Sequence, residues 1–238
     1  MLVTIIGRGH SGTRAISETL SKSGFYMGEP LNGSWDLIPP EKMYEACRVF
    51  GSYVKHTGGL SWDFSKVIDT TPDPVFVRLI EEYLHSVLSS KAENKGWKIP
   101  ETTLCYPWIL KMFPEIYCIH WVRDPRDCIL SGHVTDDLND FNIKYPETFD
   151  IREKRAISWK YQRELMKATK APQHLLSLRF EDMVFKQDET LLKLEDFLSM
   201  PMAKIHMRTD SVGRYKTDNK TSFFDFFKED MLECGYEI

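Results

Sequence analysis

The sequence predicts an α/β fold of three layers, in which helices cover both faces of a mainly parallel sheet. Three short apolar runs, rich in β-branched or large apolar residues, indicate buried strands at residues 2–6, 116–122 and 174–180. Stretches with apolar residues at helical spacing separate these runs, and a glycine-rich turn directly follows the first. Because strands that alternate with helices need crossover connections, the sheet is expected to be parallel.

Length and composition favour one domain, residues 1–238. A chain of 238 residues, 42% of them hydrophobic, is long enough to bury one continuous core. Its formal net charge of −4 provides no basic field, so we expect no nucleic-acid partner. The opening apolar run is too short for a signal peptide or a membrane span.

Cysteine usage indicates a reduced protein, and we predict a cytoplasmic location. The five cysteines are scattered, odd in number, and include no C-x-x-C pair. This pattern disfavours both a zinc site and a disulfide framework.

The first half of the chain contains four predicted helices. Residues 13–24 carry apolar side chains on one face and end at a glycine, which is a common helix stop. Residues 41–54 and 74–92 are also predicted to be helical, the latter from four apolar residues at helical spacing. Residues 96–99 are predicted as a strand or loop edge, and residues 103–113 as a helix.

The second half continues the alternation. The second apolar run leads directly into Arg123, and Pro125 then suits a first helical turn, where its missing N–H costs nothing. The remaining predicted helices cover residues 127–132, 151–171, 189–198 and 221–233.

The strongest local signal is the loop Gly7-Arg8-Gly9-His10-Ser11-Gly12-Thr13-Arg14, between the first strand and the first helix. Backbone N–H groups and the helix dipole bind phosphate at such a junction. The loop is similar to a Walker A loop, but Thr13 and Arg14 occupy the places of the Lys and Ser/Thr that hold β/γ-phosphates and Mg²⁺. Hydrolysis of ATP or GTP is therefore disfavoured, and we expect no metal. The cradle suits one compact anionic group such as a 5′-phosphosulfate; the alternative is a purely structural turn.

A second signal lies at the carboxyl end of the second strand, where α/β sheets bind ligands. It consists of Val122-Arg123-Asp124-Pro125-Arg126-Asp127, followed by Ser131. The Arg123 guanidinium and the Ser131 hydroxyl can converge on one phosphate through charge-assisted, directional hydrogen bonds. The alternative is an Arg–Asp surface network at a helix start.

Together these stretches resemble the family of sulfotransferases that use 3′-phosphoadenosine-5′-phosphosulfate (PAPS). GHSGTRAISETL resembles the family's 5′-phosphosulfate loop, VRDPRDCILS its Arg…Ser pair for the 3′-phosphate, and SVGRYK its late Gly-Arg segment. The resemblance implies a P-loop-like topology, PAPS as cosubstrate with 3′-phosphoadenosine-5′-phosphate (PAP) as product, and no metal. The donor-binding residues it implies are Arg8, Gly9, His10, Ser11, Gly12, Thr13, Arg14, Arg123, Ser131, Gly213, Arg214 and Lys216.

The same resemblance implies catalytic roles for four residues. His10 stands where relatives carry Lys or Arg, and a protonated His10 can stabilise the bridging oxygen of the donor. Lys98-Ile99-Pro100-Glu101 is similar to the family's Lys-x-Pro element, which implies that Lys98 lies near the transferring sulfuryl group. A general base must take the proton of the acceptor, and Glu29 is the first candidate, with Glu101 the second.

Other functions stay open at the level of sequence. A P-loop kinase is one, although Thr13 in the lysine position argues against it, and a nucleotide-binding module that has lost catalysis is another, because of His10. The class of the acceptor and the oligomeric state are left open. Trp35, Trp62, Trp108 and residues 223–227 can line an acceptor pocket, but we predict that such aromatic residues fill the core. His120 and His133 are predicted to be structural.

Overall fold

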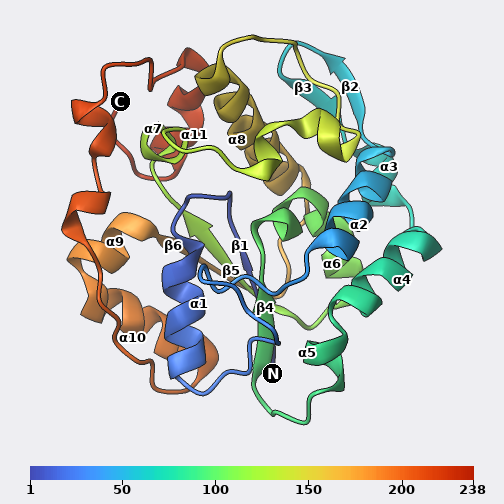
Figure 1. The fold of residues 1–238 in the computed structure, drawn as a ribbon, viewed down its shortest axis with the longest axis vertical. Helices are drawn as coiled ribbons and strands as arrows, with labels where there is room; N and C mark the ends of the chain where they lie inside the picture. The colour runs from blue at the N-terminus through green and yellow to red at the C-terminus, as the bar shows by residue number, and fades with distance from the viewer.

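The computed structural model describes residues 1–238 and confirms the α/β fold (Figure 1). One parallel sheet has the strand order β4-β1-β5-β6. Its strands are β1 (Leu2–Ile6), β4 (Lys95–Lys98), β5 (Tyr117–Val122) and β6 (His174–Arg179). The three predicted strands are confirmed, and the segment predicted as a strand or loop edge is β4.

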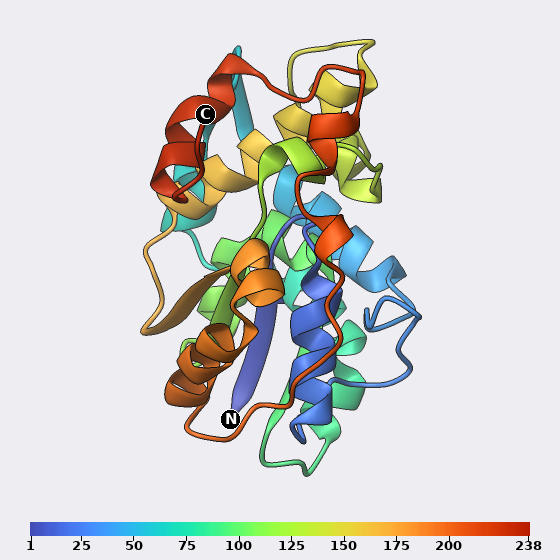
Figure 2. The ribbon, with the colours of Figure 1, turned by 90° about the vertical axis from the view of Figure 1, so that its left-hand side faces the viewer.

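Helices form a layer on each face of the sheet (Figures 1 and 2). Helices α1, α9 and α10 bury their apolar side chains against one face, and α2, α4, α6 and α8 against the other. The helices are α1 (Thr13–Lys22), α2 (Glu41–Gly51), α3 (Ser65–Asp69), α4 (Pro74–Tyr83), α5 (His85–Ser89), α6 (Tyr106–Met112), α7 (Pro125–Cys128), α8 (Ile151–Ala168), α9 (Phe180–Phe185), α10 (Gln187–Leu198) and α11 (Lys228–Glu233). Figure 2 shows the chain after α10 running up alongside α1.

The strand order determines where a site can form. All four strands are parallel, so their carboxyl ends lie at one edge of the sheet. Since β1 lies between β4 and β5, the glycine loop after β1 is flanked by the segments that follow Lys98 and Val122. Three predicted motifs therefore meet at this edge.

Two predicted helices are shorter than expected. The helix predicted at residues 127–132 ends at Cys128, because the carbonyls of Ile129 and Leu130 accept hydrogen bonds from the Arg155 guanidinium instead of continuing the helix. The helix predicted at residues 74–92 is interrupted at Leu84, which is wholly buried, and resumes as α5.

Two other predicted helices also differ from the structure, and one hairpin was not predicted. The predicted helix at residues 103–113 begins as a 3₁₀ turn, Pro100–Cys105, before α6. The tail prediction holds only for α11 and a short 3₁₀ turn before it. No local pattern predicted the hairpin of β2 (Lys55–Gly58) and β3 (Ser61–Asp63).

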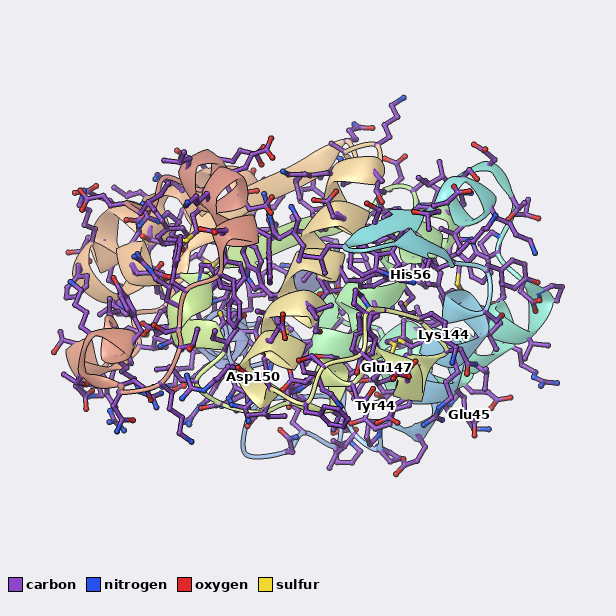
Figure 3. All side chains as sticks on the ribbon, turned by 90° about the horizontal axis from the view of Figure 1, so that it is seen from above. Tyr44, Glu45, His56, Lys144, Glu147 and Asp150 are labelled. Carbon is purple, nitrogen blue, oxygen red and sulfur yellow. The ribbon has the colours of Figure 1, made fainter.

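The hairpin and α2 are bridged by the segment before α8. Trp62 of β3 donates a hydrogen bond to the Lys144 carbonyl, and Asn142 donates one to the Arg48 carbonyl in α2. Seen from above, Lys144 and Glu147 lie between the hairpin and α2 (Figure 3). No helix of the chain is long and apolar enough to cross a membrane.

Candidate functional site

The glycine loop presents free backbone donors. The N–H groups of Gly9, His10 and Gly12 donate to no protein acceptor, while Gly7 donates to the Thr103 hydroxyl over 2.9 Å. Gly12 is the N-cap of α1 and lies in the left-handed region, with a φ of 86°, so the helix has no side-chain cap. Free N–H groups at an uncapped helix N-terminus form a site for an anion.

Glycine is needed at two places in this loop because neighbouring rings approach the backbone closely. A Cβ on Gly9 would lie 2.2 Å from the His133 ring, and a Cβ on Gly12 would lie 2.5 Å from the Phe180 ring. These distances are shorter than van der Waals contact, so any other residue would displace the loop or the ring.

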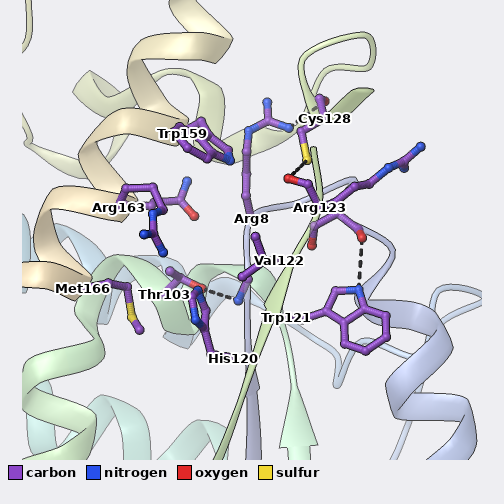
Figure 4. A pocket seen from close by; sticks show the side chains of 13 residues that line it. Arg8, Thr103, His120, Trp121, Val122, Arg123, Cys128, Trp159, Arg163 and Met166 are labelled. Carbon is purple, nitrogen blue, oxygen red and sulfur yellow. Dashed lines mark hydrogen bonds between the residues drawn. The ribbon is translucent and has the colours of Figure 1, made fainter. Parts of the chain in front are cut away.

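The Arg8 side chain points away from the loop, between Trp159 and Cys128 (Figure 4). Its guanidinium donates to the carbonyls of Gly9, at 2.8 Å, and Cys128, at 2.9 Å, and forms a buried ion pair with Asp136. The Trp121 indole donates to the Ser11 carbonyl over 3.0 Å. Arg8 was predicted to contact the donor, but its guanidinium is turned into the protein, where it joins the loop to α7.

Arg123 lies between the glycine loop and the late basic segment. Its Nη1 donates to the His10 carbonyl over 3.0 Å, and its Nη2 donates to the Ser211 carbonyl. The guanidinium lies 4.6 Å from the centre of the Phe180 ring, and its buried Nε has no partner. One N–H of this cation therefore lacks an acceptor.

Asp127 anchors the late segment. Its carboxylate accepts hydrogen bonds from the backbone N–H groups of Gly213, at 2.7 Å, and Tyr215, at 3.0 Å. The anchored turn carries Arg214 and Lys216. Asp127 thereby brings these predicted donor-binding residues to the side of Arg123, a role that its place in the sequence did not indicate.

Lys98 lies in a buried ion pair that the sequence did not reveal. Its ammonium donates to the Ser34 carbonyl over 2.8 Å and to Asp36 Oδ1 over 2.5 Å. Burial lowers the pKa of Lys98, and the Asp36 carboxylate opposes that shift. Asp36 is 62 residues away in sequence, so no local motif connects the two.

Glu101 is a second carboxylate in this region. It is wholly buried, and neither carboxylate oxygen has a hydrogen-bond partner. Burial raises its pKa to about 7, and the nearby Asp36 adds to the shift. Its Oε1 lies 3.9 Å from the Nε2 of His133, whose pKa is lowered to about 3 by burial, with Arg8 adding to the shift.

His10 is placed at the mouth of the site in its neutral form. Its Nε2 lies 2.6 Å from the Gly132 carbonyl and donates to it. Partial burial lowers the pKa of His10 below its ordinary value of 6.5, so the ring is mainly uncharged at neutral pH. The positive charge predicted for His10 must therefore come from another residue, or from protonation of His10 when an anion binds.

Two cavities meet at the start of α1. One, of about 230 Å³, has no hydrophobic residue in its lining, and the other, of about 330 Å³, has an apolar wall that includes Phe180, Ile205 and Met207. Both are bordered by Gly12 and Arg14. The lining of the polar cavity comprises His10, Gly12, Thr13, Arg14, Ser34, Asp36, Lys98, Pro100, Arg123 and His133.

Some predicted residues lie outside both cavities. Glu29 is exposed, and its backbone N–H donates to the Ser86 hydroxyl over 3.2 Å. Ser131 is half-buried in the irregular segment after α7. His133 was predicted to be structural but borders the polar cavity, while Trp62 and Trp108 are core residues, as predicted.

Comparisons with known proteins identify the family and support the fold. The family model described as the sulfotransferase family matches residues 3–204. A sulfotransferase domain from the Synechococcus PCC 7002 olefin synthase is 13% identical with a TM-score of 0.60, covering 100% of this chain and 95% of that domain. A sulfotransferase domain from the curacin biosynthetic pathway is 13% identical with a TM-score of 0.56, covering 99% of this chain and 98% of that domain. At such identities the likeness establishes the fold. No curated protein matches the chain significantly in sequence.

Proposed function

The chain belongs to the sulfotransferase family, and from that premise we propose that it transfers a sulfuryl group from PAPS to an acceptor hydroxyl or amine. The observation that carries the proposal is the convergence of the free N–H groups of the glycine loop, Arg123 and the anchored late segment beside two cavities that share Gly12 and Arg14 in their linings. We infer that one nucleotide spans both cavities.

One cavity is polar and the other has an apolar wall, and PAPS likewise has a charged phosphosulfate end and an aromatic adenine end. The phosphosulfate end would take the polar cavity, where the loop N–H groups, Thr13 and Arg14 border it. The adenine would take the cavity walled by Phe180, because aromatic and apolar side chains stabilise a stacked base. The 3′-phosphate would be held by Arg123, Ser131 and the late-segment residues Gly213, Arg214 and Lys216, of which Arg123 has a buried Nε without a partner.

Catalysis in this proposal depends on positioned charge. Sulfuryl transfer resembles phosphoryl transfer in requiring little more than in-line positioning and stabilisation of the charge that develops on the leaving oxygen. Lys98 supplies positive charge at the wall of the polar cavity, where its ammonium is shared with the Asp36 carboxylate, whereas Arg8 does not border this cavity and pairs with Asp136. His10 borders the same cavity and is free to take up a proton when an anion arrives.

Calorimetric titration with PAP, with ATP and Mg²⁺ as the competing ligand, tests the donor proposal. Tight binding of PAP with little response to ATP would support it, and the reverse preference would make a kinase the better assignment. Transfer of labelled sulfate from PAPS then separates an enzyme from a binding module. Binding of PAP without transfer to any acceptor would indicate a module in which the His10 substitution has abolished catalysis.

We also propose a reducing compartment such as the cytoplasm. All five cysteines are free, and the buried Cys47 thiol donates a hydrogen bond to the Cys105 sulfur over 3.9 Å. In an oxidising compartment so close a buried pair would be expected to form a disulfide. Five titratable thiols in the protein as purified from its native source would support this location, and three would contradict it.

A further inference from the structure

The acceptor side of the polar cavity has a consistent chemistry. Away from the glycine loop, its wall is formed by Ser34, Asp36, Lys98, Pro100 and His133. Apart from the proline ring, this wall offers hydroxyl, carboxylate, ammonium and imidazole groups. The loop of residues 32–36 that provides two of them is hydrophilic and has only one apolar side chain, that of Trp35.

Such a wall discriminates between classes of acceptor. Steroids, simple phenols and fatty alcohols gain about 25 cal/mol for each Å² of apolar surface that they bury against a protein. The cavity that we assign to adenine offers that kind of surface through Phe180, Ile205 and Met207, whereas the acceptor wall does not. An apolar acceptor would therefore cover the exposed Ser34 and the accessible part of the Asp36 carboxylate without compensating contacts.

Asp36 is the only carboxylate that borders this cavity. Its Oδ1 accepts from Lys98, and its Oδ2 accepts from the Asn32 amide over 3.1 Å. The Asn32 Oδ1 in turn accepts from the backbone N–H groups of Ser34, at 2.8 Å, and Asp36, at 3.0 Å. The carboxylate is thus held in place before any substrate binds, whereas Glu101 lies behind the wall with almost no exposed surface.

Building on the proposed function, we propose that the acceptor is a polyhydroxylated, sugar-like molecule bound between the loop of residues 32–36 and Pro100 with His133, and that Asp36 accepts its proton. In the transfer step the acceptor oxygen forms a bond to sulfur, and its proton passes to an Asp36 carboxylate oxygen. The bond between sulfur and the bridging oxygen breaks, and its electron pair stays with the phosphate of PAP. Lys98, which contacts Asp36, holds the carboxylate beside the sulfur.

The first test compares acceptor classes with the wild-type enzyme and labelled PAPS. The polar probes are N,N′-diacetylchitobiose and methyl β-galactoside, and the apolar probes are naphthol and dehydroepiandrosterone. We expect kcat/KM for at least one sugar to exceed that for both apolar probes by about tenfold or more. A preference for an apolar probe, or transfer to neither sugar while PAP binds tightly, would overturn the inferred acceptor class. Failure of PAP to bind would instead overturn the donor proposal and everything that depends on it.

The second test uses Asp36→Asn, which keeps the size of the side chain and removes its basicity. We expect kcat with the preferred sugar to fall by about 100-fold or more, while PAP binds at least as tightly because Lys98 loses its anionic partner. The matched control is Asp188→Asn, the same change at an exposed carboxylate that pairs with Lys204 on the surface. Wild-type kcat in Asp36→Asn would exclude Asp36 as the proton acceptor. A lower kcat with weaker PAP binding would indicate a collapsed cavity and would also count against the role.

Discussion

The donor side and the acceptor side of the polar cavity are built by different means. The donor side is formed mainly by backbone groups. The loop presents free N–H groups, and the carbonyls of His10 and Ser211 accept hydrogen bonds from the Arg123 guanidinium. On the acceptor side, burial and neighbouring charges shift the pKa values of the ionisable side chains Lys98, Glu101 and His133, and the Asp36 carboxylate contributes to the shifts of Lys98 and Glu101. The donor side should therefore be sensitive to geometry, and the acceptor side to pH.

The sharpest test of the donor side is Gly12→Ala. A side chain there must adopt a left-handed backbone, at a cost of about 1–2 kcal/mol, and overlap the Phe180 ring, at a further cost of about 1–3 kcal/mol. Chemical denaturation should show a loss of stability of that order, and calorimetry should show PAP binding nearly abolished. Gly33→Ala is the control, because nothing lies within 4 Å of its added Cβ. Similar behaviour of the two variants would mean that the loop is not held rigidly.

On the acceptor side, Glu101→Gln should change how stability depends on pH. Burial raises the pKa of Glu101 from an ordinary 4.5 to about 7, so the folded state holds this proton over a range where the unfolded state has lost it. Wild-type stability should therefore fall as the pH rises from about 4.5 to 7, by about 3 kcal/mol in total.

The Gln variant removes that titration and should show a flatter curve of unfolding free energy against pH. Glu115→Gln, at an exposed position, is the matched control and should follow the wild type. Parallel curves for wild type and Glu101→Gln would show that the buried carboxyl does not titrate as its surroundings imply.

On the donor side, Arg123→Ala tests the proposal that Arg123 binds the 3′-phosphate of PAP. A charge-assisted hydrogen bond contributes about 1.5–3 kcal/mol, so PAP should bind about 10- to 100-fold more weakly. Adenosine 5′-phosphate, which lacks the 3′-phosphate, should lose much less. The control is Arg78→Ala, whose side chain is 68% exposed on α4. Equal losses for the two nucleotides would remove the 3′-phosphate from the Arg123 site, and the same comparison applies to Ser131→Ala.

Asp127→Asn should have a smaller effect on the same side. It weakens the two hydrogen bonds that hold the backbone of Gly213 and Tyr215, so PAP affinity should fall by about tenfold or less. Limited proteolysis should cut residues 209–217 faster in the variant, and PAP should slow that cleavage. Asp210→Asn, an exposed aspartate of the same segment, serves as control; unchanged proteolysis in Asp127→Asn would show that the segment is held by other contacts.

The features of the fold and the site that could be predicted from the sequence are those that arise from local patterns. The strands, the glycine loop and Arg123 could be predicted because each is a local pattern: an apolar run, a glycine turn, or a basic residue at a strand end. Asp36 and Asp127 could not, because their roles arise from partners 62 and 86 residues away. His133 was assigned to structure because a lone histidine has no local signature of a cavity wall. The early end of the helix that starts at Pro125 could not be predicted either, because it depends on a hydrogen bond from Arg155, which lies 26 residues away from Ile129 in sequence.

The smallest expected effect belongs to the residue that the sequence favoured as general base. Glu29 is exposed and borders neither cavity, and a base must lie within hydrogen-bond reach of the proton that it removes. Glu29→Gln should therefore leave kcat and PAP affinity within about twofold of wild type, whereas a base would account for about 100-fold or more. If sulfate transfer were lost while PAP binding remained, the chain around residue 29 would have to move to the cavity during turnover. Asp36 would then be a partner of Lys98 and not the proton acceptor, so this variant and Asp36→Asn cannot both abolish transfer under the mechanism proposed.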